Sequence, residues 1–264
     1  MQKKVNDLAV WAEGNPKKNP ILFIHGFPYD HTMWHNQIDE LKDNYYCVSY
    51  DLRGLGKSKP GDGQHTMESH VDDLFAVIKN MKLRKPVVCA LSMGGYITLR
   101  AVERDQKKLK ALILCDTKAD ADTNAGRLTR AAAIKQINEK GVEKFVAPFV
   151  KNCFSDITLK EKKRKVVYTT TLKKSLTSKP LGLKAALLAM AGRTDTTEFL
   201  LKITIPTLVL VGQLDKLTPP SVMQAMADKI PNADFGIAPR AGHMAPLENP
   251  GFVTDMIKGF LQKL

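Results

Sequence analysis

The stretch that decides the fold is Val87-Val-Cys-Ala-Leu-Ser92-Met-Gly-Gly-Tyr96. The apolar run over residues 86–91 predicts a buried strand, and residues 93–104 have helical spacing. Ser92 stands at the junction, where the two glycines allow a sharp turn and close packing. Such a turn exposes the hydroxyl and points the positive end of a helix at it. Ser92 is therefore a candidate nucleophile, although an ordinary strand-to-helix turn with an incidental serine gives the same local pattern.

Two residues further along the chain supply the partners that a nucleophilic serine needs. A second buried strand is expected over residues 205–211 and leads to Asp215, and His243 lies in a loop before the last expected helix. A serine hydroxyl becomes nucleophilic when a neutral imidazole takes its proton, and a buried carboxylate fixes the imidazole tautomer. The sequence therefore predicts a catalytic triad of Ser92, Asp215 and His243. Asp116, which ends the preceding expected strand, is the competing acid.

An earlier strand supplies a candidate for the electrophilic side of the site. The apolar residues 21–24 run into His25-Gly26-Phe27-Pro28. Gly26 allows a tight turn that leaves the Phe27 backbone NH free to point into a pocket. Together with the Met93 NH it is expected to form a two-donor oxyanion hole.

These motifs resemble those of the α/β-hydrolase family over essentially the whole chain. The residues that carry the resemblance are His25-Gly-Phe-Pro28, Asp51-Leu-Arg-Gly-Leu-Gly-Lys-Ser58, the Ser92 turn, Asp215 and Gly242-His-Met244. Ala90 departs from the usual glycine and is expected to strain the turn slightly without changing its geometry. The serine at 92 separates the chain from the dehalogenase and epoxide-hydrolase branches, which carry aspartate there. The chain is most similar to the 3-oxoadipate enol-lactonase and small-carboxylesterase branch.

The order of expected elements predicts the architecture. Buried strands alternate with amphipathic helices, which favours a mostly parallel sheet of about eight strands with helices on both faces. The alternation stops after Asp116, and residues 118–202 show only helical patterns, at 127–140, 160–176 and 181–191. We expect residues 1–117 and 203–264 to form the α/β-hydrolase core. The resemblance implies that residues 118–202 are an inserted helical cap over the active site.

The composition bears on where the protein resides and on the state of its cysteines. The chain has 264 residues, of which 44% are hydrophobic, and no apolar run approaches the length of a membrane span. No secretory signal is recognised at the N-terminus, which predicts a cytoplasmic protein. The four cysteines show no paired spacing and are expected to be buried free thiols, although a disulfide stays open on their number alone. They are Cys47, Cys89, Cys115 and Cys153.

Positive charge is concentrated in the expected cap. Residues 118–202 hold 18 Lys and Arg against 8 Asp and Glu, which is +10 of the chain's net charge of +13. This excess fits an anionic ester or lactone, or an acidic carrier protein, as partner. A lysine-rich solvated surface explains it equally well. Neither a nucleic acid nor a membrane is expected as a partner.

Four other sequence features resemble functional sites but have simpler structural explanations. Residues 54–58 read Gly-Leu-Gly-Lys-Ser but lack the earlier glycine of a phosphate-binding loop. His31 and His35 are four residues apart without the glutamate of a zinc-protease helix, and they are expected at the surface. In the family that the chain resembles, His25 shapes its loop, and Glu248 is expected to tether the His243 loop or the last helix. No metal or organic cofactor is implied.

The resulting hypothesis is a serine hydrolase that cleaves carboxylic esters or lactones of small, including anionic, substrates through an acyl-enzyme. Two alternatives share the fold: a ligand receptor or signalling protein that retains the triad, and a cofactor-free perhydrolase of the haloperoxidase type. Steady turnover of simple esters favours the hydrolase. A single acyl transfer followed by a stall favours the receptor.

Overall fold

The fold is built on one sheet of eight strands in the order β1-β2-β4-β3-β5-β6-β7-β8. The structure, a computed structural model, describes residues 2–264. The strands are β1 Gln2–Val5, β2 Leu8–Glu13, β3 Pro20–Ile24, β4 Tyr46–Tyr50, β5 Val87–Leu91, β6 Ala111–Cys115, β7 Thr207–Gly212 and β8 Ala233–Ala238. β2 pairs antiparallel with β1 and β4, and all other pairs are parallel. The predicted α/β-hydrolase sheet is confirmed.

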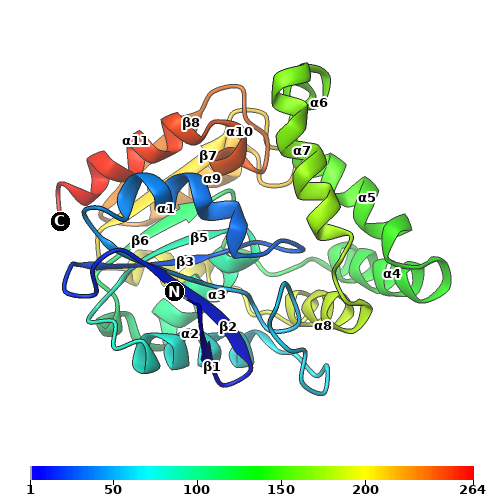
Figure 1. The fold of residues 1–264 in the computed structure, drawn as a ribbon, viewed down its shortest axis with the longest axis horizontal. Coiled ribbons are helices and arrows are strands. Elements are labelled where there is room, and N and C mark those ends of the chain that lie inside the picture. Colours follow the sequence, from blue (N-terminus) through cyan, green and yellow to red (C-terminus); the bar gives the residue numbers. More distant parts are fainter. Residues whose placement is uncertain (1) are drawn as a thin grey trace.

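Helices cover both faces of this sheet (Figure 1). The core helices are α1 His35–Leu41, α2 Met67–Asn80, α3 Met93–Asp105, α9 Pro220–Lys229, α10 Ala245–Glu248 and α11 Pro250–Leu261, with short 3-10 turns η1 His31–Trp34 and η2 Gln106–Lys108. A third 3-10 turn, η3 Thr197–Lys202, lies at the end of the expected cap segment. α1 and α11 pack together on one face, and α2 and α3 pack together on the other. Because both faces are covered, every residue of β5 and β6 is buried, which explains their continuous apolar sequences.

The parallel strands bring the candidate site residues to one edge of the sheet. β3, β5, β6 and β7 are consecutive neighbours that run in the same direction. The loops that follow them therefore leave at the same edge, where ligands of open α/β sheets bind. This edge holds the loop after β3, Ser92 after β5, Asp116 after β6 and Asp215 after β7.

Five helices separate β6 from β7 in the chain: α4 Asn124–Lys140, α5 Val142–Cys153, α6 Asp156–Lys160, α7 Lys162–Ser175 and α8 Pro180–Ala191. Figure 1 shows them gathered to one side of the sheet, in green to yellow-green. The expected helical stretches correspond to α4, α7 and α8. α5 and α6 were not expected, because Pro148 inside α5 interrupts a helical reading and α6 has only five residues.

All four cysteines are buried and free, as expected. Among residues 2–264, no helix combines the length and apolar character that crossing a membrane requires.

Candidate active site

Ser92 occupies a strained turn between β5 and α3. Its backbone has φ 52° and ψ −114°, a conformation that residues with a side chain rarely adopt. Its NH donates to the Cys115 carbonyl at 3.0 Å, and its carbonyl accepts from the Thr117 hydroxyl at 2.8 Å. A Cβ at Gly95 would overlap that hydroxyl, and one at Gly94 would lie 2.7 Å from the Ile24 carbonyl oxygen. The two glycines are therefore needed for the turn, as the sequence indicated.

Three predicted residues meet in one hydrogen-bonded chain. His243 Nδ1 lies 2.8 Å from Asp215 Oδ2, and His243 Nε2 lies 2.9 Å from Ser92 Oγ. Because an ionised carboxylate only accepts, Nδ1 carries the hydrogen, and the Nε2 of a neutral ring accepts from the serine hydroxyl. His243 is buried, with 4% of its surface exposed. This arrangement is suited to removing a proton from Ser92.

The surroundings of Asp215 favour its charged form. Oδ1 accepts from the backbone NH groups of Leu217 at 2.8 Å and Thr218 at 3.0 Å, and Oδ2 also accepts from the Thr218 hydroxyl at 2.6 Å. Burial alone would raise the pKa of Asp215, but His243 and the hydrogen bonds from Thr218 outweigh it and hold the pKa below its ordinary value. Asp215 is therefore an anion beside the imidazole.

Asp116, the competing acid, has a different environment. It is fully buried at the end of β6, and its Oδ1 accepts from the Gly212 NH at 2.8 Å. Within residues 2–264, its Oδ2 has no hydrogen-bond partner. Burial and the neighbouring charge of Asp215 raise the pKa of Asp116 well above its ordinary value. Of the two aspartates, only Asp215 makes the hydrogen bond to His243.

The loop after β3 packs directly against the serine turn. A Cβ at Gly26 would lie 2.7 Å from Leu91 Cδ2 and 3.2 Å from Ser92 Cβ, so glycine allows this approach without a shift of either neighbour. His25 holds the loop, because its Nδ1 lies 2.8 Å from the Gly26 carbonyl oxygen and its Nε2 accepts from the Leu52 NH at 2.8 Å. Burial lowers the pKa of His25, which leaves it neutral. In the described part of the chain, the NH groups of Phe27 and Met93 donate no hydrogen bond.

Glu248 tethers the His243 loop, as expected. Its Oε1 accepts from the Gly242 NH at 2.7 Å. Its Oε2 accepts from the Ser155 NH at 2.9 Å and from the Ser155 hydroxyl at 2.6 Å. Ser155 lies between α5 and α6, so this buried carboxylate fastens the histidine loop to the helical segment. Ser155 itself was not singled out, because a partner 93 residues away leaves no local pattern.

A buried cluster around Arg193 was also missed. Its guanidinium pairs with Asp122 at 2.7 Å, donates to the Asp120 carbonyl at 2.7 Å and lies 4.2 Å above the ring of Tyr96. Asp120 and Asp122 precede α4 and Arg193 follows α8, while Tyr96 lies one helical turn after Ser92. The cluster therefore joins both ends of the helical segment to the helix that begins at the serine.

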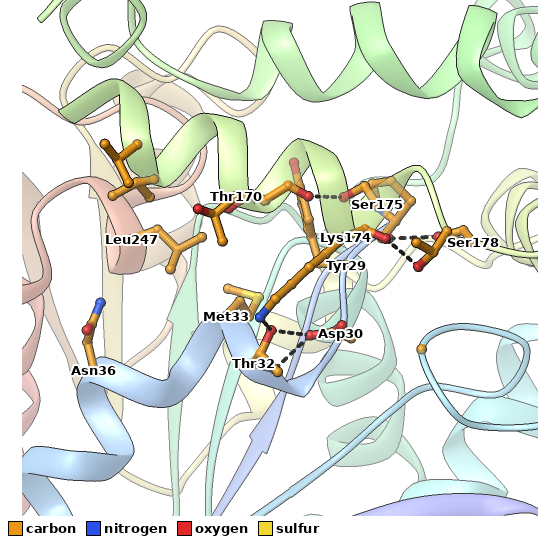
Figure 2. Close-up of a pocket in the computed structure, with 16 residues that line it drawn as sticks. Tyr29, Asp30, Thr32, Met33, Asn36, Thr170, Lys174, Ser175, Ser178 and Leu247 are labelled. Atoms are coloured by element: carbon orange, nitrogen blue, oxygen red, sulfur yellow. Dashed lines mark hydrogen bonds between the residues drawn. The ribbon is translucent and has the colours of Figure 1, made fainter. Parts of the chain in front are cut away.

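A cavity of about 250 Å³ lies between α7 and residues 28–36 (Figure 2). Pro28 and Tyr29, which directly follow Phe27, form part of one wall, and Thr170, Lys174 and Ser178 form part of the opposite wall. Lys174 Nζ donates to the Thr32 hydroxyl across the cavity at 2.7 Å. Ser92, Asp215 and His243 are not among the lining residues, so this cavity does not contain the hydrogen-bonded chain.

Two described clusters bring three metal-ligating groups within 4.8 Å of one another: Asp116, Asp215 and His243, and Asp30, His31 and Asp51. In the second, Asp51 Oδ1 lies 2.8 Å from both the backbone nitrogen and Nδ1 of His31, and the Trp11 ring stacks on the imidazole. These contacts explain the cluster as a structural hydrogen-bond network. The expectation that His31 lies at the surface was wrong, because Trp11 covers it, whereas His35 is exposed.

Comparison with known proteins places the chain in a family. The profile of the family described as alpha/beta hydrolase fold matches residues 19–250, and the chain belongs to this family. It is 26% identical to 3-oxoadipate enol-lactonase 1 of Acinetobacter baylyi over 257 residues, 97% of this chain and 94% of that protein. It is 29% identical to the pimeloyl-[acyl-carrier protein] methyl ester esterase of Legionella pneumophila over 250 residues, 92% of this chain and 95% of that one.

One solved structure is similar over the full length. A thermophilic esterase from Thermogutta terrifontis, solved with malate bound, is 35% identical, with a TM-score of 0.94 and coverage of 100% of this chain and 98% of that chain. The predicted resemblance to the enol-lactonase and small-esterase branch is therefore confirmed.

Proposed function

We propose, from membership of the α/β-hydrolase family and the geometry around Ser92, that the protein is a serine hydrolase of carboxylic esters or lactones. The observation that carries the proposal is the hydrogen-bonded chain from Ser92 Oγ through His243 to Asp215. The esterase and enol-lactonase relatives support the same class of reaction. The proposed reaction needs no metal or organic cofactor.

In the proposed mechanism, His243 Nε2 removes the proton of Ser92 as Oγ attacks the substrate carbonyl. The charge of Asp215 stabilises the imidazolium that forms. His243 then returns the proton to the leaving alcohol or enol oxygen, and an acyl-Ser92 ester remains. Water, activated by the same imidazole, hydrolyses this ester and regenerates the serine.

The oxyanion of each tetrahedral intermediate is assigned to the NH groups of Phe27 and Met93. Their support is that neither NH has another acceptor within residues 2–264 and that Gly26 packs on Ser92. Met93 is the first residue of α3, so its NH belongs to the positive end of a helix. Removal of one donor of this kind typically lowers kcat about 10²–10³-fold.

Residues 118–202 are proposed to act as a cap, with residues 1–117 and 203–264 as the hydrolase core. The Glu248–Ser155 hydrogen bond and the Arg193–Tyr96 contact support this division, because they join the helical segment to the element after the His243 loop and to the helix that follows Ser92. Phe145 and Phe149 of α5 also pack against the ring of Phe27. The helical segment therefore contacts the residue assigned to the oxyanion hole.

Small anionic esters or lactones are the proposed substrates. The net charge of +10 over residues 118–202 would attract them. The Thermogutta terrifontis esterase binds malate, a dicarboxylate, and the Legionella pneumophila relative acts on an acyl-carrier-protein ester. An acidic carrier protein is therefore a second proposed partner. The four free thiols fit a reducing compartment and support a cytoplasmic location.

The proposal is tested with purified protein and a panel of p-nitrophenyl esters, enol lactones and acidic acyl conjugates. Steady turnover that is absent in Ser92→Ala is the expected result. One acyl group transferred per molecule, followed by a stall, would instead favour a ligand receptor. Peracid formation from a carboxylic acid and hydrogen peroxide, faster than ester hydrolysis, would favour a cofactor-free perhydrolase.

A further inference from the structure

Two carboxyl groups stand beside one imidazole at the edge of the sheet. Asp116 follows β6 and Asp215 follows β7, and these strands are parallel neighbours. A carboxylate oxygen of each aspartate and a ring nitrogen of His243 all lie within 4.8 Å of one another. The proposed mechanism uses only Asp215, so it leaves the second carboxyl group without a role.

The hydrogen bonds favour a negative charge on Asp215 rather than on Asp116. Asp215 accepts from Leu217, Thr218 and His243, whereas the Gly212 NH is the only donor to Asp116 among residues 2–264. Two carboxylates at this separation resist being ionised together. The Asp215 carboxylate accepts more hydrogen bonds and therefore holds the charge, which favours the protonated form of Asp116.

The other titratable groups near Asp116 also disfavour its ionisation. Besides Asp215 and His243, they are the Cys115 thiol on β6 and the Glu248 carboxyl on α10. Asp116 is completely buried, and no cation forms an ion pair with it among the described residues. Its Oδ2 has no acceptor or donor there, so the proton can leave without breaking a hydrogen bond within residues 2–264.

We propose that Asp116 is a proton-bearing positioning residue: as a neutral acid it leaves the negative charge of the site to Asp215, and once ionised it becomes a second counter-charge for His243. This inference rests on the proposed function, since it assigns Asp116 to the same imidazole. Its consequence is clearest when Asp215 is removed. Without that neighbouring charge Asp116 loses its proton more readily, and its anion then stabilises the imidazolium in place of Asp215.

The test compares pH profiles of kcat/KM for p-nitrophenyl acetate in Asp215→Asn and in Asp116→Asn/Asp215→Asn. Ser92→Ala/Asp215→Asn supplies the background at each pH. We expect Asp215→Asn to be depressed about 10⁴-fold at pH 7 and to recover at least about tenfold toward alkaline pH, relative to wild type. The double variant should lack this recovery. Superimposable profiles of the single and double variants would overturn the inference.

The single variant alone keeps the test decisive if the double variant does not fold. If the pH profile of Asp215→Asn ran parallel to that of wild type, ionisation of Asp116 would not restore any activity. Asp116 would then not replace Asp215 as the counter-charge of His243. A purely structural Asp116 would change folding but not the pH profile of a residual activity.

Infrared spectroscopy separates this inference from the proposed function. A buried protonated carboxyl group gives a carbonyl stretch distinct from that of carboxylates, and it should be present in wild type at neutral pH and absent in Asp116→Asn. If wild type hydrolyses no ester, the proposed function fails, and this band still decides whether Asp116 carries a proton. No band assignable to Asp116 would overturn the inference even if esters are hydrolysed.

Discussion

At the scale of single residues, the site depends on Ser92 being held where His243 can reach its hydroxyl. The turn motif and the chain order of serine, aspartate and histidine predicted these three residues, and the structure brings them within hydrogen-bond distance of one another. Their catalytic role stays a prediction. The sequence left Asp116 and Asp215 as competing acids. Only the hydrogen-bond geometry distinguishes them, since both follow buried strands and share the same residue type.

Replacement of Ser92 tests the nucleophile. We expect Ser92→Ala to lower kcat for p-nitrophenyl esters about 10⁴–10⁶-fold, because the members of a triad act as a unit. Adding His243→Ala should lower it hardly further. The melting temperature should be unchanged or slightly higher, because the hydroxyl contributes little to packing. Retention of a tenth of the activity in Ser92→Ala would exclude Ser92 as the nucleophile.

The protonation of Asp116 has a consequence for stability. Its pKa is raised in the folded protein, mainly by burial and then by Asp215, whereas an unfolded aspartate titrates near about 3.9. Its contribution to stability is complete below that value and is lost as pH rises toward the folded-state pKa. Asp116→Asn stays neutral throughout. We therefore expect the melting temperature of the variant, relative to wild type, to increase from about pH 4 to pH 8.

The titration of Asp215 does not interfere with this measurement, because its pKa is shifted in the opposite direction. Because the folded-state pKa of Asp215 is lowered, its stabilisation is present above about 3.9 and declines only at more acidic pH. It therefore adds no slope between about pH 5 and 8. A melting difference between Asp116→Asn and wild type that is flat over this range would show that Asp116 ionises normally in the folded protein.

At the scale of helices and loops, most elements of the core were predictable because they repeat a simple pattern. Strands buried on both faces read as apolar runs, and Thr66 with Ser69 forms the N-terminal cap that begins α2. α5 was not predictable, because Pro148 disfavours a helix interior, and burial of Phe145, Val146 and Val150 overrides that preference. Contacts between distant elements, such as Arg193 with Asp122, leave no local signal.

Replacement of Glu248 should affect both segments that it holds, the loop at Gly242 and the turn at Ser155. Glu248→Ala removes the acceptor of the buried Gly242 and Ser155 NH groups, and each unpaired NH costs about 1–3 kcal/mol. We expect a loss of about 2–4 kcal/mol in the free energy of unfolding, measured by denaturant titration. kcat should also fall, because Gly242 precedes His243.

A matched control is Glu40→Ala, which removes an exposed glutamate paired with Lys258 at 2.7 Å. Exposed pairs of this kind contribute about 0–1 kcal/mol, so stability and kcat should barely change. Equal effects of the two substitutions would show that Glu248 does not fasten the histidine loop.

At the scale of the whole molecule, the positive charge is concentrated in the helical segment rather than in the core. The excess of cations over residues 118–202 was visible in the sequence, but whether it binds a ligand depends on where it lies relative to the substrate. Arg164 already donates to the backbone carbonyls of Arg240 and Glu248, so it has a structural role. Lys162, Lys163 and Lys165 are exposed and make no ion pair within residues 2–264.

These lysines provide the test of anionic substrates. We expect kcat/KM for a carboxylate-bearing ester to fall as ionic strength rises, whereas a neutral ester of equal size barely changes, because salt screens charges beyond about 8–10 Å. Replacing Lys162, Lys163 and Lys165 with Gln should reduce the difference. The same replacement of Lys3, Lys4 and Lys17, exposed lysines of the core, should leave it intact. Parallel salt curves for the two esters would show that the charge is solvated surface.

In the proposed mechanism, Ser92 carries the acyl group during turnover. The most direct measurement is peptide mapping by mass spectrometry after acid quench of wild type turning over p-nitrophenyl butyrate. We expect one butyryl group, on Ser92, that disappears when the substrate is exhausted and never forms in Ser92→Ala. Steady hydrolysis with no acyl group on Ser92, or with the group on another residue, would contradict the proposed mechanism.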